Sequence, residues 1–183
     1  MIWNEILCLG DSITYGARDR YGRSYPAELA KIMFETTGEF YYCHNYSVCG
    51  DTSSDLQKKC WNATRSHSNS KLALIMIGTN DTQSAIPVDI YRDNIRQIVS
   101  VARVHGMLPI VATLPELGFT PLYIKNKNLI QEYNKVLYTL SEEMDFELCD
   151  MSGTEKYYID NVHYTHEGYK ILAKKFASKI LNL

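Results

Sequence analysis

The sequence predicts an α/β fold: a three-layer α/β/α sandwich built on a flavodoxin-like, five-stranded parallel sheet. Two observations support this prediction. Five short runs rich in apolar residues, typical of buried strands, alternate with five stretches in which apolar residues recur at helical spacing. Strands that alternate with helices form parallel crossover connections, which are almost always right-handed, and so build a parallel sheet. The length of 183 residues suits a single domain over residues 1–183.

The predicted strands are four to eight residues long, and Gly, Asp, Ser or Asn residues follow most of them. In chain order they cover Ile6–Leu9, Tyr41–Val48, Leu72–Ile77, Leu108–Leu114 and Phe146–Cys149.

The predicted helices lie between and after these strands. Pro26 suits the first turn of a helix over Tyr25–Thr36, because proline is favoured there. The next helix begins at Thr52, which forms a capping box with Asp55, and runs to about Ala63. The three later helices follow from apolar residues at helical spacing, over Tyr91–Ala102, Ile130–Met144 and Tyr169–Ile180.

The composition excludes several classes of partner. The net charge of -2, with 21 acidic and 19 basic residues, offers no basic surface for nucleic acid and no polybasic run for a membrane. No stretch approaches the roughly 18 apolar residues of a membrane span, and the N-terminus does not resemble a signal peptide, so we expect a cytoplasmic protein. Five cysteines without a C-x-x-C pair indicate reduced, mostly buried thiols. The sequence contains no metal-ligand spacing or phosphate-binding glycine loop, and we expect no cofactor.

Polar residues follow four of the predicted strands. The first strand runs into Gly10-Asp11-Ser12, the second is followed by Gly50, the third by "GTND" with Asn80, and the fifth by "DNVH", residues 160–163. Ligands of open parallel sheets bind beyond the carboxyl ends of the strands, so these turns should face one crevice. Together these turns supply a hydroxyl, a backbone amide beside a glycine, a carboxamide, and an imidazole with a carboxylate. These are the groups that acyl transfer requires.

These four blocks, in this order, resemble those of the SGNH or GDSL hydrolases, from residue 6 to about residue 169. "GDSIT" is similar to the family's serine block, Gly50 to its glycine block, "GTND" to its asparagine block and "DNVHYTHEGY" to its last block. The resemblance implies a catalytic triad of Ser12, His163 and Asp160. It also implies an oxyanion hole made by the backbone N–H groups of Ser12 and Gly50 and the side-chain amide of Asn80.

The roles implied by the resemblance agree with the chemistry of the side chains. A serine hydroxyl needs a base to remove its proton, and His163 would be that base and later the acid that protonates the leaving alkoxide. Asp160 would hold one ring nitrogen protonated so that the other faces Ser12. His166 lies in the first turn of the last helix, where we expect it to be solvated. The family often has proline after the histidine, whereas this chain has Tyr164.

The expected function is that of a serine esterase acting on small carboxylic esters, with short acyl groups on a carbohydrate or a similar alcohol. Three alternatives stay open at the level of sequence. The same triad serves a lysophospholipase or an acyl-thioesterase. The fold can also be a non-catalytic binding module, or a flavodoxin-like phosphate binder that uses the first turn.

Candidate substrate contacts lie near these blocks. The stretch 115–128 is long for a connection in an α/β unit and is expected to form a lid, and ordinary surface packing is the alternative for its apolar residues. Asp11 adjoins the nucleophile, although hydrogen bonding within the turn suits it better. The candidate substrate-binding residues are Asp11, Tyr15, Phe119, Tyr123 and Tyr164.

Overall fold

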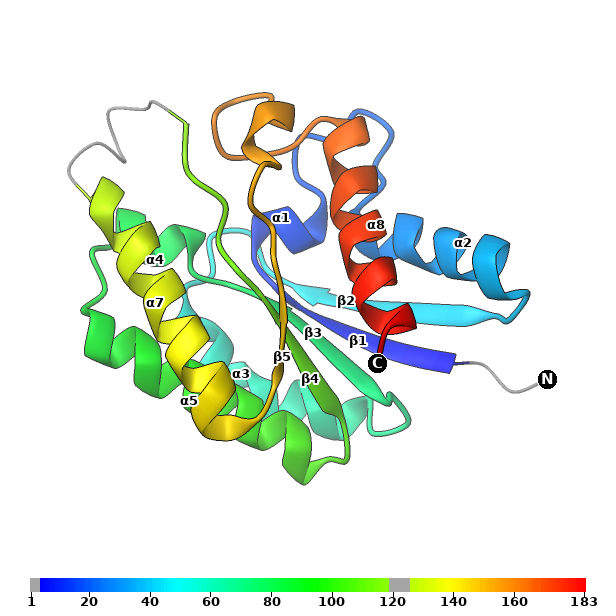
Figure 1. The fold of residues 1–183 in the computed structure, drawn as a ribbon, viewed down its shortest axis with the longest axis horizontal. Helices are drawn as coiled ribbons and strands as arrows, with labels where there is room; N and C mark the ends of the chain where they lie inside the picture. The colour runs from blue at the N-terminus through cyan, green and yellow to red at the C-terminus, as the bar shows by residue number, and fades with distance from the viewer. Residues whose placement is uncertain (1–3, 119–125) are drawn as a thin grey trace.

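The computed structural model describes residues 4–118 and 126–183, and its centre is a sheet of five parallel strands (Figure 1). The strand order β2-β1-β3-β4-β5 is that of flavodoxin-like folds, so the predicted fold class is confirmed. The strands are β1 (Asn4–Gly10), β2 (Tyr41–Ser47), β3 (Leu72–Met76), β4 (Leu108–Ala112) and β5 (Glu147–Cys149).

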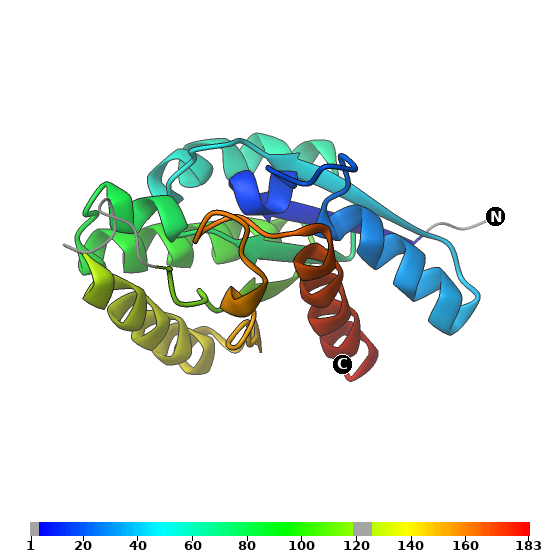
Figure 2. The same ribbon diagram turned by 90° about the horizontal axis from the view of Figure 1, so that it is seen from above.

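Helices cover both faces of the sheet. The helices α2 (Tyr25–Thr37) and α8 (His166–Leu181) pack on one face. On the other face lie α3 (Ser53–Ser66), α5 (Val88–Val104) and α7 (Lys127–Met144). Figure 2 shows α3 and α8 on opposite sides of the sheet.

The apolar side chains of the central strands divide between the two faces. In β1, Ile6 and Cys8 join the core beneath α2 and α8, whereas Leu7 and Leu9 join the core beneath the other helices. Successive side chains of a strand point to opposite faces, so a strand covered on both sides must be apolar throughout. This is why the run Ile6–Leu9 lacks polar residues.

Most predicted elements occur within a few residues of their expected bounds. The capping box at the start of α3 is present, because the Thr52 side chain accepts from the backbone N–H of Asp55 while the Asp55 side chain accepts from that of Thr52. Two short helices were expected to be turns: α1 (Ser12–Tyr15) and α4 (Thr79–Gln83). Helices of four or five residues are too short to show an apolar period. A 3-10 helix covers Glu155–Tyr157.

Three of the five cysteines are buried, as expected for most of them. Cys8, Cys60 and Cys149 are buried, Cys43 is half-buried on the edge strand β2, and Cys49 is exposed. All five are free thiols.

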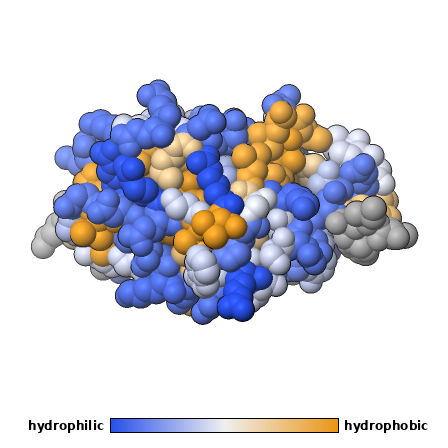
Figure 3. Space-filling model, turned by 90° about the horizontal axis from the view of Figure 1, so that it is seen from below, coloured by the Kyte–Doolittle hydropathy of each residue, from blue (hydrophilic) through white to orange (hydrophobic). Residues whose placement is uncertain are grey.

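The surface mixes polar and apolar side chains. On the face seen in Figure 3, hydrophobic side chains form patches between hydrophilic ones. Within the two described stretches, no helix is both long and apolar enough to cross a bilayer.

Candidate active site

Ser12 lies directly after β1, at the first residue of α1. The Asp11 side chain accepts a hydrogen bond of 2.9 Å from the backbone N–H of Ile13 and so caps this helix. Gly10 is required where the strand ends, because a Cβ there would collide with the Thr14 side chain and the Met76 carbonyl oxygen. The strand end and the cap together fix the position of the Ser12 hydroxyl.

Ser12, His163 and Asp160 form a chain of hydrogen bonds. The Ser12 Oγ lies 2.9 Å from Nε2 of His163, and Nδ1 of His163 lies 2.8 Å from Oδ2 of Asp160. An ionised carboxylate only accepts hydrogen bonds, so Nδ1 carries the proton and Nε2 is free to accept the serine proton. The structure therefore brings together two residues that lie 151 positions apart in the chain.

The loop that carries Asp160 and His163 is closed on itself. Tyr158 and Tyr164 form an antiparallel bridge at its base, and the backbone N–H of Ile159 donates to the His163 carbonyl oxygen at 2.7 Å. This loop lies beside α1 beyond the carboxyl ends of the strands (Figure 1). The closed loop keeps the imidazole over the serine.

The Asp160 carboxylate is stabilised in its ionised form. Its Oδ1 accepts from the backbone N–H of His163 at 2.7 Å and from that of Val162 at 3.2 Å. Burial by itself would raise the pKa of Asp160, but the hydrogen bonds from His163 hold that pKa below its ordinary value. The Arg18 Nε also lies 3.5 Å from Oδ2. The carboxylate is thus available to orient the ring.

The predicted oxyanion donors lie around one cavity of about 440 Å³, here called the Ser12 cavity. Gly50 has a φ of 87°, a left-handed conformation that favours glycine, and its missing side chain would point into open space. The side-chain amide of Asn80 donates to the Asp51 carbonyl oxygen at 2.9 Å, which holds this amide in place. The cavity is lined by Ser12, Ala17, Arg18, Cys49, Gly50, Asn80, Gln83, Val162 and His163.

A buried carboxylate behind Asn80 joins two of the loops around the Ser12 cavity. Asp81 accepts from the backbone N–H of Ser53 at 2.9 Å and from its hydroxyl at 2.5 Å, which ties the start of α3 to α4. Burial raises the pKa of Asp81, and the hydrogen bonds from Ser53 partly offset this. Asp51 is held in turn by Lys59 at 2.7 Å. Sequence reasoning missed this support, because an Asn-Asp pair in a turn gives no sign of its long-range partners.

Asp11 is 1% exposed and caps α1, so the structure assigns it to the turn and not to the substrate contact also considered for it. Burial raises its pKa to about 7, and the nearby carboxylates of Asp81 and Asp51 add to the rise. Its Oδ2 is buried without a hydrogen-bond partner among the described residues. Below about pH 7, this oxygen is the one that would carry the proton of the neutral carboxyl.

Of the other expected substrate contacts, the two that lie among the described residues, Tyr15 and Tyr164, do not line the Ser12 cavity. Tyr164 is fully buried, with its hydroxyl 2.8 Å from that of Thr154, so it packs the base of the loop and has no access to substrate. Tyr15 is 60% exposed but does not line the cavity. Phe119 and Tyr123, and with them part of the expected lid, lie outside the described residues.

His166 is half-buried instead of solvated as expected. Its Nδ1 lies 3.1 Å from the Asp19 carboxylate, and the Tyr21 ring packs edge-on against the imidazole. The reason is that the loop between α1 and α2 folds over the first turn of α8, a tertiary contact that helical position alone does not reveal.

Five of the described residues around the Ser12 cavity were not predicted as site residues from the sequence: the apolar Ala17 and Val162, and Arg18, Cys49 and Gln83. The run "GARDRYGR" directly after the serine block is a local cluster of basic residues that could have indicated Arg18. Cys49 adjoins Gly50, and Gln83 lies one helical turn beyond Asn80, so both follow from the blocks once the local structure is known.

The comparisons with known proteins bear on the fold and on the family of this chain. Three solved structures share the fold. A lipase/acylhydrolase from Enterococcus faecalis is 22% identical, with 98% of this chain and 96% of that chain covered and a TM-score of 0.83. An acetylxylan esterase from Geobacillus stearothermophilus is 21% identical (97% and 94% covered, TM-score 0.81), and a carbohydrate acetylesterase from Sinorhizobium meliloti is 20% identical (98% and 99% covered, TM-score 0.82). No curated protein matches the chain. The model of the GDSL-like lipase/acylhydrolase family matches residues 8–171, which include all the triad and oxyanion candidates. The chain therefore belongs to the GDSL-like lipase/acylhydrolase family.

Proposed function

We propose that the protein is a serine esterase that cleaves small carboxylic esters through an acyl-enzyme on Ser12. The observation that carries this proposal is the chain of hydrogen bonds from the Ser12 hydroxyl through His163 to Asp160, at 2.9 and 2.8 Å. A serine is an effective nucleophile only where a base within hydrogen-bond distance can accept its proton, and this geometry meets that requirement.

In the first half of the reaction, Ser12 Oγ attacks the ester carbonyl carbon while its proton passes to Nε2 of His163. The carbonyl oxygen becomes an oxyanion, which the backbone N–H groups of Ser12 and Gly50 and the side-chain amide of Asn80 stabilise. Asp160 stabilises the imidazolium that forms. The intermediate then expels the alcohol, whose oxygen takes the proton from Nε2, and the acyl group stays on Ser12.

In the second half, water replaces the alcohol. His163 removes a proton from the water as its oxygen attacks the acyl carbon, and the same donors stabilise the second oxyanion. Collapse of this intermediate releases the carboxylic acid and returns the proton to Ser12. Each donor in such a hole is typically worth about 3 kcal/mol, because the donors are already oriented when the charge develops.

We propose short acyl groups on a carbohydrate or a similar alcohol as the substrate class. The Ser12 cavity, about 440 Å³ as bounded by the described residues, lies toward the lower end of the usual range of ligand pockets, and hydroxyl, amide and guanidinium groups are among those that line it. Two of the solved structures that share this fold are named an acetylxylan esterase and a carbohydrate acetylesterase. Those names favour acetyl esters of sugars here as well.

The decisive experiment is hydrolysis of p-nitrophenyl acetate by the wild type and by Ser12→Ala. Loss of the nucleophile should lower turnover by at least about 10³-fold. The matched control is Ser68→Ala, an exposed serine outside the site, which should keep wild-type turnover. Substantial hydrolysis by Ser12→Ala, or failure of a fluorophosphonate to label Ser12, would instead support a non-catalytic binding module.

The acyl length is tested with p-nitrophenyl esters from acetate to palmitate. We expect the largest kcat/KM for the two- to four-carbon acids, because many of the described side chains around the Ser12 cavity are polar and offer little apolar surface for a long acyl chain. A maximum at eight carbons or more would favour the lysophospholipase or acyl-thioesterase alternative.

A further inference from the structure

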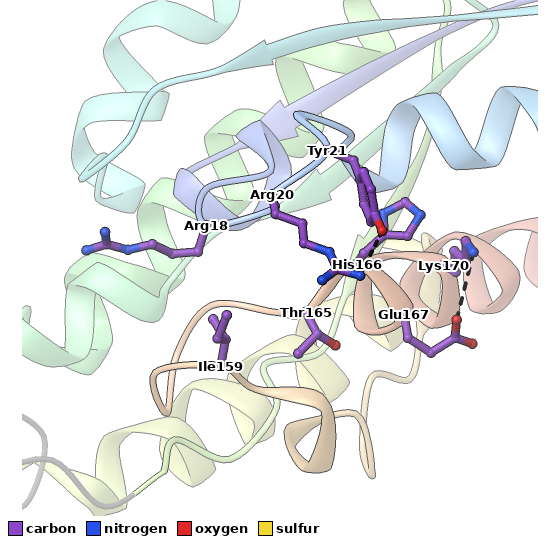
Figure 4. A pocket seen from close by; sticks show the side chains of 8 residues that line it. All are labelled: Arg18, Arg20, Tyr21, Ile159, Thr165, His166, Glu167 and Lys170. Carbon is purple, nitrogen blue, oxygen red and sulfur yellow. Dashed lines mark hydrogen bonds and ion pairs between the residues drawn. The ribbon is translucent and has the colours of Figure 1, made fainter.

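A second cavity, of about 540 Å³, adjoins the Ser12 cavity and is not used by the proposed reaction. We call it the Arg20 cavity; it is lined by Arg18, Arg20, Tyr21, Ile159, Thr165, His166, Glu167 and Lys170. Figure 4 shows Arg20, Tyr21 and His166 gathered beside the start of α8, while Arg18 extends away from them. Arg18 lines both cavities.

The lining carries three permanent cations and one carboxylate. That carboxylate is Glu167, and it forms a long ion pair of 3.9 Å with Lys170. In the described part of the chain, Arg20 has no carboxylate within ion-pair distance, although surface arginines commonly have one. Arg18 lies 3.5 Å from the Asp160 carboxylate, so among the described residues Arg20 is the permanent cation of this lining that has no carboxylate partner.

The guanidinium of Arg20 is held by neutral groups. It donates to the Tyr21 hydroxyl at 2.7 Å and lies over the Tyr21 ring at 4.6 Å from its centroid. The same ring packs edge-on against His166, with centroids 4.9 Å apart. These contacts order the side chain without neutralising its charge, which leaves N–H donors for a ligand.

Two further carboxylates, Asp19 and Glu28, lie behind the lining, next to His166. Asp19 has a fully buried side chain that accepts from the backbone N–H groups of Tyr21 and Arg23 and faces His166. Glu28 has a side chain that is 4% exposed; it lies 3.5 Å from Arg23 and 3.9 Å from Nε2 of His166. Both carboxylates are thus turned into the protein, behind the lining.

The position of the Arg20 cavity indicates which part of a substrate it would contact. Ile159 and Thr165 flank the loop that carries Asp160 and His163, so the cavity lies on the imidazole side of Ser12. The imidazole protonates the leaving alcohol in the proposed reaction, and that alcohol must therefore lie on the same side. A group on the alcohol part is the one that can reach Arg20.

We propose that the Arg20 cavity binds an anionic group, a carboxylate or a phosphate, carried by the alcohol part of the ester. This inference rests on the proposed function, because it assigns the substrate class of the same site. Arg20 and Lys170 contact the anion, and the hydroxyls of Tyr21 and Thr165 are further polar groups around it. Arginine suits this task because its planar N–H groups match two oxygens of a carboxylate or phosphate.

The kinetic test compares acetylated glucuronic acid with acetylated glucuronamide, which differ in charge but little in shape. We expect kcat/KM to be at least about tenfold higher for the acid, since a hydrogen bond between two charged groups is stronger than one from a cation to a neutral amide. Acetylated glucose 6-phosphate against acetylated glucose tests the phosphate in the same way. The pair with the larger ratio identifies the group.

The variants Arg20→Gln and Lys170→Gln should bring the acid-to-amide ratio toward one. The matched control Lys58→Gln removes a charge from α3, on the opposite face of the sheet, and should keep the wild-type ratio. Equal hydrolysis of acid and amide by the wild type, or a ratio that survives in both variants, would overturn the inference.

Binding to Ser12→Ala separates this inference from the proposed function. Titration calorimetry should show glucuronate bound at least about tenfold more tightly than glucuronamide, and the difference should be lost on adding Arg20→Gln. Ester hydrolysis that depends on Ser12, with no preference for the anion in either assay, would overturn the anion site alone. Arg20-dependent binding without any hydrolysis would overturn the esterase and leave the anion site.

Discussion

The buried carboxyl of Asp11 gives the protein a specific dependence of stability on pH. Its pKa is raised from 3.8 to about 7, first because burial disfavours the charged form and then because Asp81 and Asp51 are near. In the unfolded chain the same carboxyl ionises near its ordinary pKa. Between these two values the folded protein holds a proton that the unfolded chain has released, so stability must fall as the pH rises.

The size of this effect follows from the two pKa values. Each unit of pKa corresponds to about 1.4 kcal/mol, so the rise from 3.8 to about 7 lowers the free energy of unfolding by about 4 kcal/mol across that window. Below the window the contribution of Asp11 is favourable and constant, and above about pH 7 the loss is complete. Asp11→Asn removes the titration while keeping an oxygen for the backbone N–H of Ile13.

The assay is urea unfolding of the wild type and Asp11→Asn at several pH values from 4.5 to 8. The difference between their unfolding free energies isolates Asp11, because the other carboxylates titrate in both proteins. We expect the wild type to lose stability relative to the variant as the pH rises. Parallel curves over this range would refute the reasoning, because they would mean that Asp11 is ionised in the folded protein throughout.

Three further substitutions test the site and its support. Asn80→Ala should lower kcat for p-nitrophenyl acetate by about 10² to 10³-fold with little change in KM, whereas the exposed Asn62→Ala should not; equal effects would argue against an oxyanion donor. Asp160→Asn should keep the loop folded but lower kcat by about 10⁴-fold, since the ring would lose its carboxylate partner, and an active variant would contradict that role. Gly10→Ala should lower the free energy of unfolding by about 1 to 3 kcal/mol, because its Cβ would collide with Thr14 and the Met76 carbonyl oxygen; an unchanged urea midpoint would show that β1 can shift to accept it.

Much of the fold was predictable because its signals are local. The strand Ile6–Leu9 is apolar at every position, which is what a strand covered on both faces requires, and Thr52 with Asp55 marks the start of α3. Ser12 could be placed at the end of the first strand for the same reason. The short helix that begins at Ser12 could not, because a few residues do not establish a period.

Contacts between distant segments were predictable only where topology requires them. The carboxyl ends of parallel strands meet at one edge of the sheet, so the crevice that gathers Ser12, Gly50 and Asn80 follows from the strand pattern. The burial of Tyr164 did not follow, because it depends on how the loop folds back onto Thr154. The link from Asp81 to Ser53 is of the same kind, since a short polar residue gives no sign of a partner 28 positions away.

The amino-acid sequence by itself determined the class of fold, the order of its elements and the chemical groups at the ends of the strands, because strand patterning and turn residues act over a few neighbouring positions. Only the tertiary structure decided that the imidazole of His163 lies 2.9 Å from the Ser12 hydroxyl, that Asp11 is buried, and that Arg20 lines a cavity and has no carboxylate within ion-pair distance among the described residues. Those features are distances and burial between segments far apart in the chain, and they exist only once the core and the loops pack together.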